Sequence, residues 1–288
     1  NRPENLTEAI NRAKIVAQNK SWMPIYKAIH EPLTLRILPC LETRPLLNEV
    51  EKQAVHPYYD IEGQNNGRLN CLKKYAKSYL PHNMGPDVKK ALKPRGYTSI
   101  FLVSDFRHCE VTVLQWLSGD EKLKELIDSG GDLHAKIYET ITGGACDSDV
   151  KRKKSKLMFL PVMYGCGAAT LSKQIDVPEN VAVELINRIK KVFGTAWGWI
   201  KSKQELAKTG IVLDYFGRPR IFPAGEAYKA QDFVVQSVAA TVCEEKMIEL
   251  HAVLDPEQAA IAFSVHDGLG LVIQKEYAKE VYQTVKKT

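Results

Sequence analysis

Two aspartates at the ends of apolar runs constrain the fold of this chain more than any other feature. Residues 100–103 form a continuous apolar run, which predicts a buried strand that delivers Asp105 at its end. Residues 261–272 form a second run, in which Asp267 lies between His266 and Gly268. That pattern predicts two short strands around a tight turn that glycine permits. The fold must therefore support two carboxylates at strand ends.

The segment after Asp105 predicts a helix that begins near Glu110, because Val111, Leu114 and Leu117 follow at helical spacing. A single aspartate before a helix is more often a cap or a solvated turn residue. A second aspartate in a similar setting favours a metal site, since a carboxylate at a strand end is held rigidly.

A later helix predicted from the sequence carries four residues spaced four apart: Arg152, Lys156, Leu160 and Tyr164. This spacing places them on one face. Two cations near one end and an aromatic ring near the other could grip a triphosphate and press against a base. The alternative is an amphipathic core helix whose cations extend to solvent.

Positive charge is concentrated in two places, although the net charge is only +6. Residues 68–95 hold eight Lys or Arg against one acid, and five of the six residues 151–156 are basic. Such clusters suit a phosphate backbone, whereas an isolated one is often a solvated face. Next to a carboxylate pair, they favour a polyanionic partner.

The cysteine pattern and the absence of apolar spans exclude several classes of protein. None of the six cysteines forms a CxxC pair or a spacing suited to zinc, so they predict reduced thiols in an intracellular protein. The first residues are polar and charged, and the longest nearly apolar stretch, 157–171, is too short for a membrane span. We expect no membrane partner. The first residue is Asn, which leaves open a fragment of a longer protein.

The remaining elements follow from local patterns. Residues 1–30 predict a helix and 32–40 a strand, and 121–145 predict helices with Asp132 as a cap. Residues 172–209 predict two helices, with Val183, Ile186, Ile189 and Val192 on one apolar face. A hairpin with Gly217 at its turn is expected at 211–223, then a helix at about 230–250 and a final helix containing Val281.

Three segments together resemble the motifs of the family A DNA polymerases of the bacterial polymerase I type. Residues 104–120 (SDFRHCEVTVLQWLSGD) resemble motif A, 151–165 (KRKKSKLMFLPVMYG) motif B and 265–270 (VHDGLG) motif C. They occur in the family's order, and the resemblance extends from about residue 56 to 288.

The resemblance implies roles for the residues that match. Asp105 and Asp267 would be the catalytic residues and would hold two Mg²⁺ ions, with Mn²⁺ as a substitute. Glu110 would crowd the sugar 2′-hydroxyl. The remaining nucleotide-site residues implied in this way are His134, Arg152, Lys156, Leu160 and Tyr164.

The resemblance also implies contacts with primer–template DNA. Gly165 would lie with Tyr164 at the templating position, and Arg68, within Gly-Arg-Leu, would contact the primer end. The other implied DNA contacts are Arg218, Arg220, Gln236 and His266. Several positions depart from the family. Leu160 replaces an aromatic residue, Asp232 an Asn and Gly268 a Glu, Gln64 and Asn66 stand in place of Thr, and Pro161 lies inside the motif B helix, where it should cause a kink.

The implied fold is a right-hand α/β (α+β) polymerase fold, with an antiparallel-sheet palm, helical fingers and a truncated thumb. The expected division is 1–56 for part of the thumb and the return to the palm, 57–120 for the palm with motif A, 121–209 for the fingers and 210–288 for the palm with motif C. An incomplete thumb predicts a weak grip on duplex DNA.

The implied function is template-directed DNA synthesis from dNTPs, inside a cell and with further domains or replication proteins in the full-length protein. A virus or plasmid origin stays open. Two alternatives also stay open. The first alternative is a phage-type single-subunit RNA polymerase or a primase-polymerase, because Gly270 matches a glycine of the phage-type enzymes. Glu110 favours DNA synthesis over this alternative. The other is a non-catalytic nucleic-acid-binding remnant.

Overall fold

The computed structural model describes residues 56–57, 59–60, 64–71, 78–79, 94 and 98–288. The chain packs as two units: the sheet unit comprises residues 1–105 and 243–288, and the helical unit comprises residues 106–242. The predicted helix at 1–30, the predicted strand at 32–40 and most of the basic segment 72–98 lie outside the described residues.

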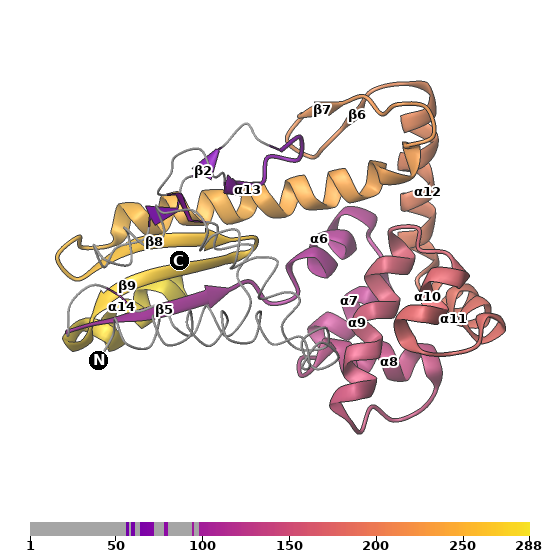
Figure 1. Cartoon of the computed structure of the whole chain (residues 1–288), viewed down its shortest axis with the longest axis horizontal. Helices are drawn as coiled ribbons and strands as arrows, with labels where there is room; N and C mark the ends of the chain where they lie inside the picture. The colour runs from indigo at the N-terminus through magenta and orange to yellow at the C-terminus, as the bar shows by residue number, and fades with distance from the viewer. Residues whose placement is uncertain (1–55, 58, 61–63, 72–77, 80–93, 95–97) are drawn as a thin grey trace, which may run out of the picture. The chain divides into compact units, whose positions relative to one another are not determined.

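The sheet unit is built on three antiparallel strands, β5 (Ser99–Asp105), β8 (Ala259–Val265) and β9 (Gly268–Gln274), in the order β5-β9-β8 (Figure 1). Leu269, Leu271 and Ile273 alternate along the central strand and are buried. They pack in one cluster with Leu250 of α13 (Ala230–Val253) and Val281 of α14 (Ala278–Lys287). The core of this unit is therefore one face of the sheet covered by helices.

Short strands accompany this sheet. Each of these strands has two residues. The strands β1 (His56–Pro57) and β4 (Ser78–Tyr79) pair in parallel, and β2 (Tyr59–Asp60) and β3 (Asn70–Cys71) pair in antiparallel. The Tyr59 hydroxyl donates to the Ser264 carbonyl at 2.6 Å and accepts from the Ser264 N–H at 2.8 Å. This pair of bonds ties β2 to β8.

The prediction that residues 100–103 form a buried strand was right about the strand and wrong about its burial. Ile100 and Leu102 are only partly buried, and the Val103 side chain is 64% exposed. β5 lies at the edge among the three described strands, and its side chains alternate between the two faces of the sheet, so Ile100 and Leu102 pack against the core whereas Val103 faces away from it.

The β8–β9 turn was predicted correctly, but glycine does not supply its unusual backbone. His266 has a φ of 56°, while Gly268 is not among the glycines with positive φ. Glycine matters here for space. A Cβ at Gly270 would lie 2.1–2.4 Å from ring atoms of Phe263, whose ring also meets Phe101 edge-to-face at 5.7 Å.

The helical unit begins at α6 (Cys109–Ser118) and ends within α13. Its other helices are α7 (Glu121–Asp128), α8 (Leu133–Thr142), α9 (Asp149–Met163), α10 (Ala168–Ile175), α11 (Glu179–Val192) and α12 (Gly194–Thr209). The hairpin of β6 (Val212–Leu213) and β7 (Pro219–Arg220) follows, then the short 3₁₀ turn η3 (Ala227–Lys229). A second 3₁₀ turn, η4 (Lys275–Tyr277), precedes α14 in the sheet unit.

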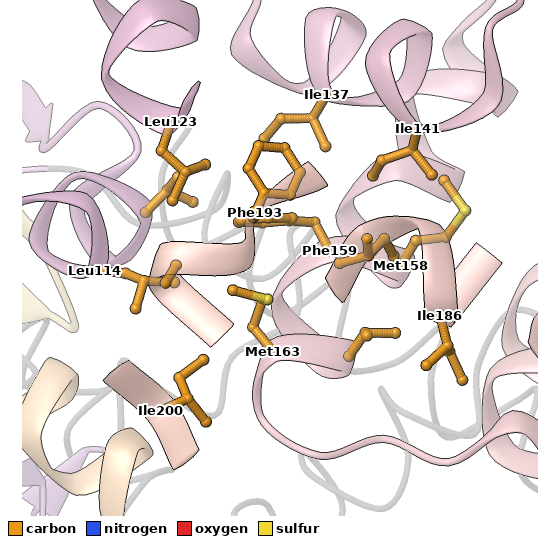
Figure 2. Close-up of a cluster of buried hydrophobic side chains, with 14 of the residues drawn as sticks. Leu114, Leu123, Ile137, Ile141, Met158, Phe159, Met163, Ile186, Phe193 and Ile200 are labelled. Carbon is orange, nitrogen blue, oxygen red and sulfur yellow. The ribbon is translucent and has the colours of Figure 1, made fainter. Parts of the chain in front are cut away.

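Figure 2 shows the core of the helical unit, to which α6, α7, α8, α9, α11 and α12 all contribute buried side chains. Phe159 of α9 and Phe193, between α11 and α12, meet edge-to-face with ring centroids 5.0 Å apart, and both are essentially fully buried. A pair of this kind is stabilised by its geometry in addition to the apolar area that it buries.

Helix caps fix the entry of the chain into these helices. Asp132 accepts hydrogen bonds from the His134 and Ala135 N–H groups at the start of α8, as predicted. Asp120 caps α7 through the Leu123 N–H and also accepts from the Ala196 N–H near the start of α12, both at 2.9 Å. Asp120 is only 2% exposed, so this carboxylate joins two helix N-termini in the interior.

The predictions for residues 172–209 were partly correct. Two helices are present there, but α10 was missed as a separate helix. On α11, Ile186 and Ile189 are buried as predicted, but Ala182 is buried in place of Val183, which is 44% exposed. The small Ala fits the tightly packed side, and the larger Val is left on the rim. The hairpin was correct, with Gly217 at a φ of 84°.

The described part of the chain is mostly helical with a small antiparallel sheet, which confirms the coarse expectation of helices combined with an antiparallel sheet. Within the residues described, we find no helix with the length and apolar character needed to cross a membrane.

Candidate active site

The two aspartates singled out from the sequence lie together in the sheet unit. Asp105 is the last residue of β5 and pairs in register with Gly268, the residue that directly follows Asp267. Burial, and then the negative charge of Asp267, raise the pKa of the Asp105 carboxyl. Strand register therefore brings two like charges close enough to repel each other.

This arrangement fits a hard divalent cation. Aspartate oxygens are the ligands that Mg²⁺ prefers, and this ion keeps several waters, so two carboxylates and substrate phosphates suffice. A cation would also relieve the repulsion between the two aspartates. The described residues contain no cluster of three or more His, Cys, Asp or Glu placed to hold a metal.

Gly268 shapes the surroundings of Asp105. A Cβ on this residue would lie 3.1 Å from Asp105 Oδ1 and 3.3 Å from the carbonyl oxygens of Ser104 and Val265. Those distances are tighter than nearly all ordinary Cβ contacts, so a side chain here would displace its neighbours. The residue that replaces the expected Glu thus lets the Asp105 carboxylate approach the β9 backbone closely.

A second group of charged residues lies in the helical unit, where α8 and α9 pack together. Arg152 of α9 donates through Nε to the Oδ2 atom of Asp132, the cap of α8. Burial alone would raise the pKa of Asp132, but the Arg152 hydrogen bond and the backbone N–H groups of Ala135 and His134 lower it. One cation predicted to bind phosphate is therefore held by a carboxylate of its own unit.

Two histidines lie beside this ion pair. The His108 and His134 rings meet edge-to-face with centroids 5.0 Å apart. His108 Nε2 and His134 Nδ1 are buried, and neither atom has a hydrogen-bond partner among the described residues. Burial, then the charges of Lys156, the neighbouring His108 and Arg152, lower the pKa of His134 to about 4. Burial and Arg107 lower the pKa of His108 as well. Both rings are neutral near pH 7.

Glu110 and Tyr164 are joined across the helical unit. The Tyr164 hydroxyl donates to Glu110 Oε2 at 3.2 Å, which links the first turn of α6 to the residue that ends α9. Gly165 follows with a φ of 96°, a left-handed conformation that glycine adopts without strain. Leu160, one turn earlier, is partly buried against the core. The structure thus brings together Glu110 and Tyr164, two residues that the sequence assigned to one site.

The residues predicted to contact DNA each have a partner within the protein. Arg218 forms an ion pair with the buried Asp214 at 3.3 Å. The Arg220 guanidinium lies 4.6 Å from the Phe222 ring centroid. Gln236 donates to Asp232, the residue that replaces the family's Asn, at 2.6 Å.

Two further DNA-contact candidates, Arg68 and His266, lie in the sheet unit, whereas Gly165 lies in the helical unit beside Tyr164. The backbone N–H of Arg68 donates a hydrogen bond to Asn66 Oδ1 at 3.2 Å, within a turn. His266 lies beside Asp267 in the β8–β9 turn. The candidates are thus divided between the two units.

Sequence reasoning missed His108 and the pairing of Asp132 with Arg152. His108 lies inside the motif A segment, but no spacing rule connects it to His134, 26 residues later. Asp132 was recognised only as a helix cap. Its second role follows from the packing of α8 on α9, which local patterns do not encode.

Comparison with known proteins agrees with these features. A model of DNA polymerase family A matches residues 7–288. The thermostable DNA polymerase I of Thermus filiformis is 30% identical over 261 residues, which cover 85% of this chain and 31% of that protein. The thermostable DNA polymerase I of Thermus aquaticus is 29% identical over 309 residues, covering 96% of this chain and 36% of that protein.

The chain therefore spans about a third of the length of these curated relatives. Among solved structures, it is similar to one described as the POL domain of Pol1 from M. smegmatis in complex with DNA primer-template and dNTP. The TM-score is 0.70 at 19% identity, over 94% of this chain and 52% of that one.

Proposed function

Because the chain belongs to DNA polymerase family A, we propose that it catalyses template-directed DNA synthesis, adding dNTPs to a primer 3′-hydroxyl. The observation that carries this proposal is the register of β5 against β9, which sets Asp105 beside the turn that bears Asp267. The match to a POL domain described with primer-template and dNTP gives the class of partners.

Asp105 and Asp267 are the proposed catalytic pair and the proposed ligands of two Mg²⁺ ions, for which Mn²⁺ could substitute. Family A polymerases use divalent metals. When bound, such ions activate the primer 3′-hydroxyl and neutralise the triphosphate and the departing pyrophosphate. The raised pKa of Asp105 supports this assignment, because two repelling carboxylates gain from a cation placed between them.

Arg152, Lys156 and His134 are the proposed triphosphate-binding residues. Charge-assisted hydrogen bonds from guanidinium and ammonium groups to phosphate oxygens are short and strong. Arg152 is already bonded to Asp132, so a phosphate must compete with that carboxylate or share the guanidinium with it. Asp132 would in this way keep Arg152 aimed at the site before the nucleotide arrives.

Glu110, Tyr164 and Leu160 are proposed to line the sugar and the templating base, with Gly165 next to Tyr164. The hydrogen bond between Glu110 and Tyr164 supports this, because it fixes the carboxylate against an aromatic ring. A fixed side chain excludes a 2′-hydroxyl by occupying its place. Arg68, Arg218, Arg220, Gln236 and His266 are proposed to contact primer–template DNA.

The division into palm (57–120 and 210–288), fingers (121–209) and a partial thumb (1–56) also remains our proposal. Further domains or replication proteins in the full-length protein belong to the same proposal, since the chain spans about a third of its curated relatives. We propose that the protein works inside a cell, where such substrates are found.

Primer extension with Mg²⁺ on a DNA template tests the function, with dNTPs alone and rNTPs alone in parallel reactions. Extension with dNTPs that Asp267→Asn abolishes, and that the exposed-surface variant Asp128→Asn retains, is the expected result. Extension with rNTPs would instead favour the RNA polymerase or primase-polymerase alternative. Tight primer–template binding without extension by any nucleotide would favour a non-catalytic remnant.

A further inference from the structure

The imidazole rings of His108 and His134 lie side by side in the helical unit. His108 Nε2 and His134 Nδ1 are both buried, and within the part of the chain that the structure describes both lack a hydrogen-bond partner. A buried polar atom without a partner costs free energy, so a charged group that bound beside the pair and changed its protonation would alter that cost. The ring contact at 5.0 Å places both atoms in one small region.

The charges around this pair indicate which kind of ligand fits. Four groups act on the rings from three elements: Arg107 next to His108, Asp132 at the start of α8, and Arg152 and Lys156 on α9. Three of the four are cations. The single acid, Asp132, is already bonded to Arg152. The surroundings therefore repel a cation and favour an anion with several oxygens.

The same surroundings explain why both rings are neutral in the free protein and what an anion would change. Burial and the nearby cations lower both histidine pKa values, that of His134 to about 4. A phosphate oxygen that enters has the opposite effect, because a nearby negative charge favours the protonated ring. Two adjacent imidazoles repel each other when both are charged, so the pair is suited to share one proton.

We propose that His108 and His134 together form a proton-accepting site for the terminal phosphates of a nucleoside triphosphate, and that the pair takes up a proton from solvent when the phosphates bind. This inference rests on the proposed nucleotide site at Arg152 and Lys156. It adds a residue, His108, to which no role had been assigned, and it makes nucleotide affinity depend on pH. Affinity should fall as the pH rises through the pKa of the phosphate-bound pair.

The experiment is calorimetric titration of the whole chain with inorganic triphosphate, without DNA, in two buffers of different ionisation enthalpy. The difference in heat gives the number of protons taken up for each triphosphate bound. We expect the wild type to take up more protons, by as much as about one, than the His108→Gln/His134→Gln double variant. Each single Gln variant should lose most of that excess and bind about tenfold more weakly.

His251→Gln, an exposed histidine on α13, is the matched control and should keep both values of the wild type. Thermal melting of each variant shows whether it folds, and Gln keeps the size of the side chain without its titration. An unchanged proton count in folded His108→Gln overturns the proposal. So does an equal count for the wild type and the double variant.

The titration also separates this inference from the proposed function. A wild type that takes up the excess proton but does not extend a primer contradicts the polymerase proposal and supports the histidine site. A wild type that extends primers but shows no excess proton uptake contradicts the histidine site alone.

Discussion

The two units position their polar groups by opposite means. In the sheet unit, backbone register sets Asp105 beside Asp267, and like charges meet. In the helical unit, side chains pair with opposite charges or with helix caps, as Arg152 and Asp132 do. The comparison teaches that the sheet holds its carboxylates against their own repulsion, whereas the helical unit pairs Arg152 with an opposite charge and keeps an excess of cations around two histidines.

The largest effect on DNA synthesis should come from removing one of the two carboxylates that repel each other in the sheet unit. Asp105→Asn or Asp267→Asn should lower synthesis by about 1000-fold or more, because a divalent ion contributes several kcal/mol of charge stabilisation. DNA binding and the melting temperature should stay the same or rise, since the raised pKa of Asp105 means that its charge opposes folding at neutral pH. Primer extension and melting curves measure both. Retained synthesis in either variant would remove the pair from the catalytic role.

The stability of the two units can be compared through one core residue in each. Phe193→Ala should cost about 3–5 kcal/mol and Leu271→Ala about 2–5 kcal/mol, because both side chains are fully buried. If the units unfold separately, each substitution should shift a different step of a denaturant titration followed by circular dichroism. A single shared step, lowered by both substitutions, would show instead that the units unfold together.

The Glu110–Tyr164 bond tests whether side-chain pairing in the helical unit controls sugar selection. Glu110→Ala should relax discrimination against ribonucleotides by roughly 10- to 100-fold, since an open pocket rejects a hydroxyl only weakly. Tyr164→Phe removes the hydrogen bond but keeps the ring, so it should have a smaller effect. The ratio of dNTP to rNTP incorporation under single-nucleotide conditions is the measurement, and an unchanged ratio in Glu110→Ala excludes this role.

The close contact between Gly270 and Phe263 allows the packing of the sheet unit to be tested separately from that of the helical unit. Gly270→Ala should destabilise the sheet unit by about 1–3 kcal/mol, because the new methyl group would overlap the Phe263 ring. Adding Phe263→Leu should recover part of that loss by removing ring atoms from the overlap. Melting of the two variants and of Phe263→Leu alone gives the coupling between the residues, and additive losses would contradict the contact.

The smallest effect concerns the acid stability of the helical unit. The folded pKa of His134, about 4, lies below its ordinary value of 6.5, so the unfolded chain binds more protons between these values. The contribution to stability is complete above about pH 6.5 and is lost as the pH falls toward 4. His134→Gln should therefore reduce the loss of melting temperature between pH 7 and pH 5, whereas His251→Gln should not.

The sequence predicted the helical unit well because its signals are local. The cap at Asp132, the spacing on α9 and the turn at Gly217 all depend on residues within a few positions of one another. The sheet was predicted as strands and a turn, but not the burial of β5. Whether a strand lies at an edge depends on partners more than 150 residues away.

The candidate site shows the same difference between features that local sequence predicts and features that depend on contacts between distant segments. The motif segments supplied Asp105, Asp267 and Glu110, whose chemistry follows from residue type and place in the chain. The role of His108 and the approach of Gly268 to Asp105 depend on the packing of one segment against another. Those contacts have no signature in a single sequence.

The buried carboxylate of Asp120 has a consequence for the order of folding. Its two oxygens serve the N-termini of two helices, and the Ala196 N–H of the second lies 76 residues from Asp120 in the chain, so one oxygen lacks its partner until α12 docks beside α7. An early intermediate with only α6 and α7 packed would bury a half-satisfied charge, which is costly. The barrier to folding this unit should therefore include the closure of that long loop, and the helices between should gain protection from hydrogen exchange together rather than one after another.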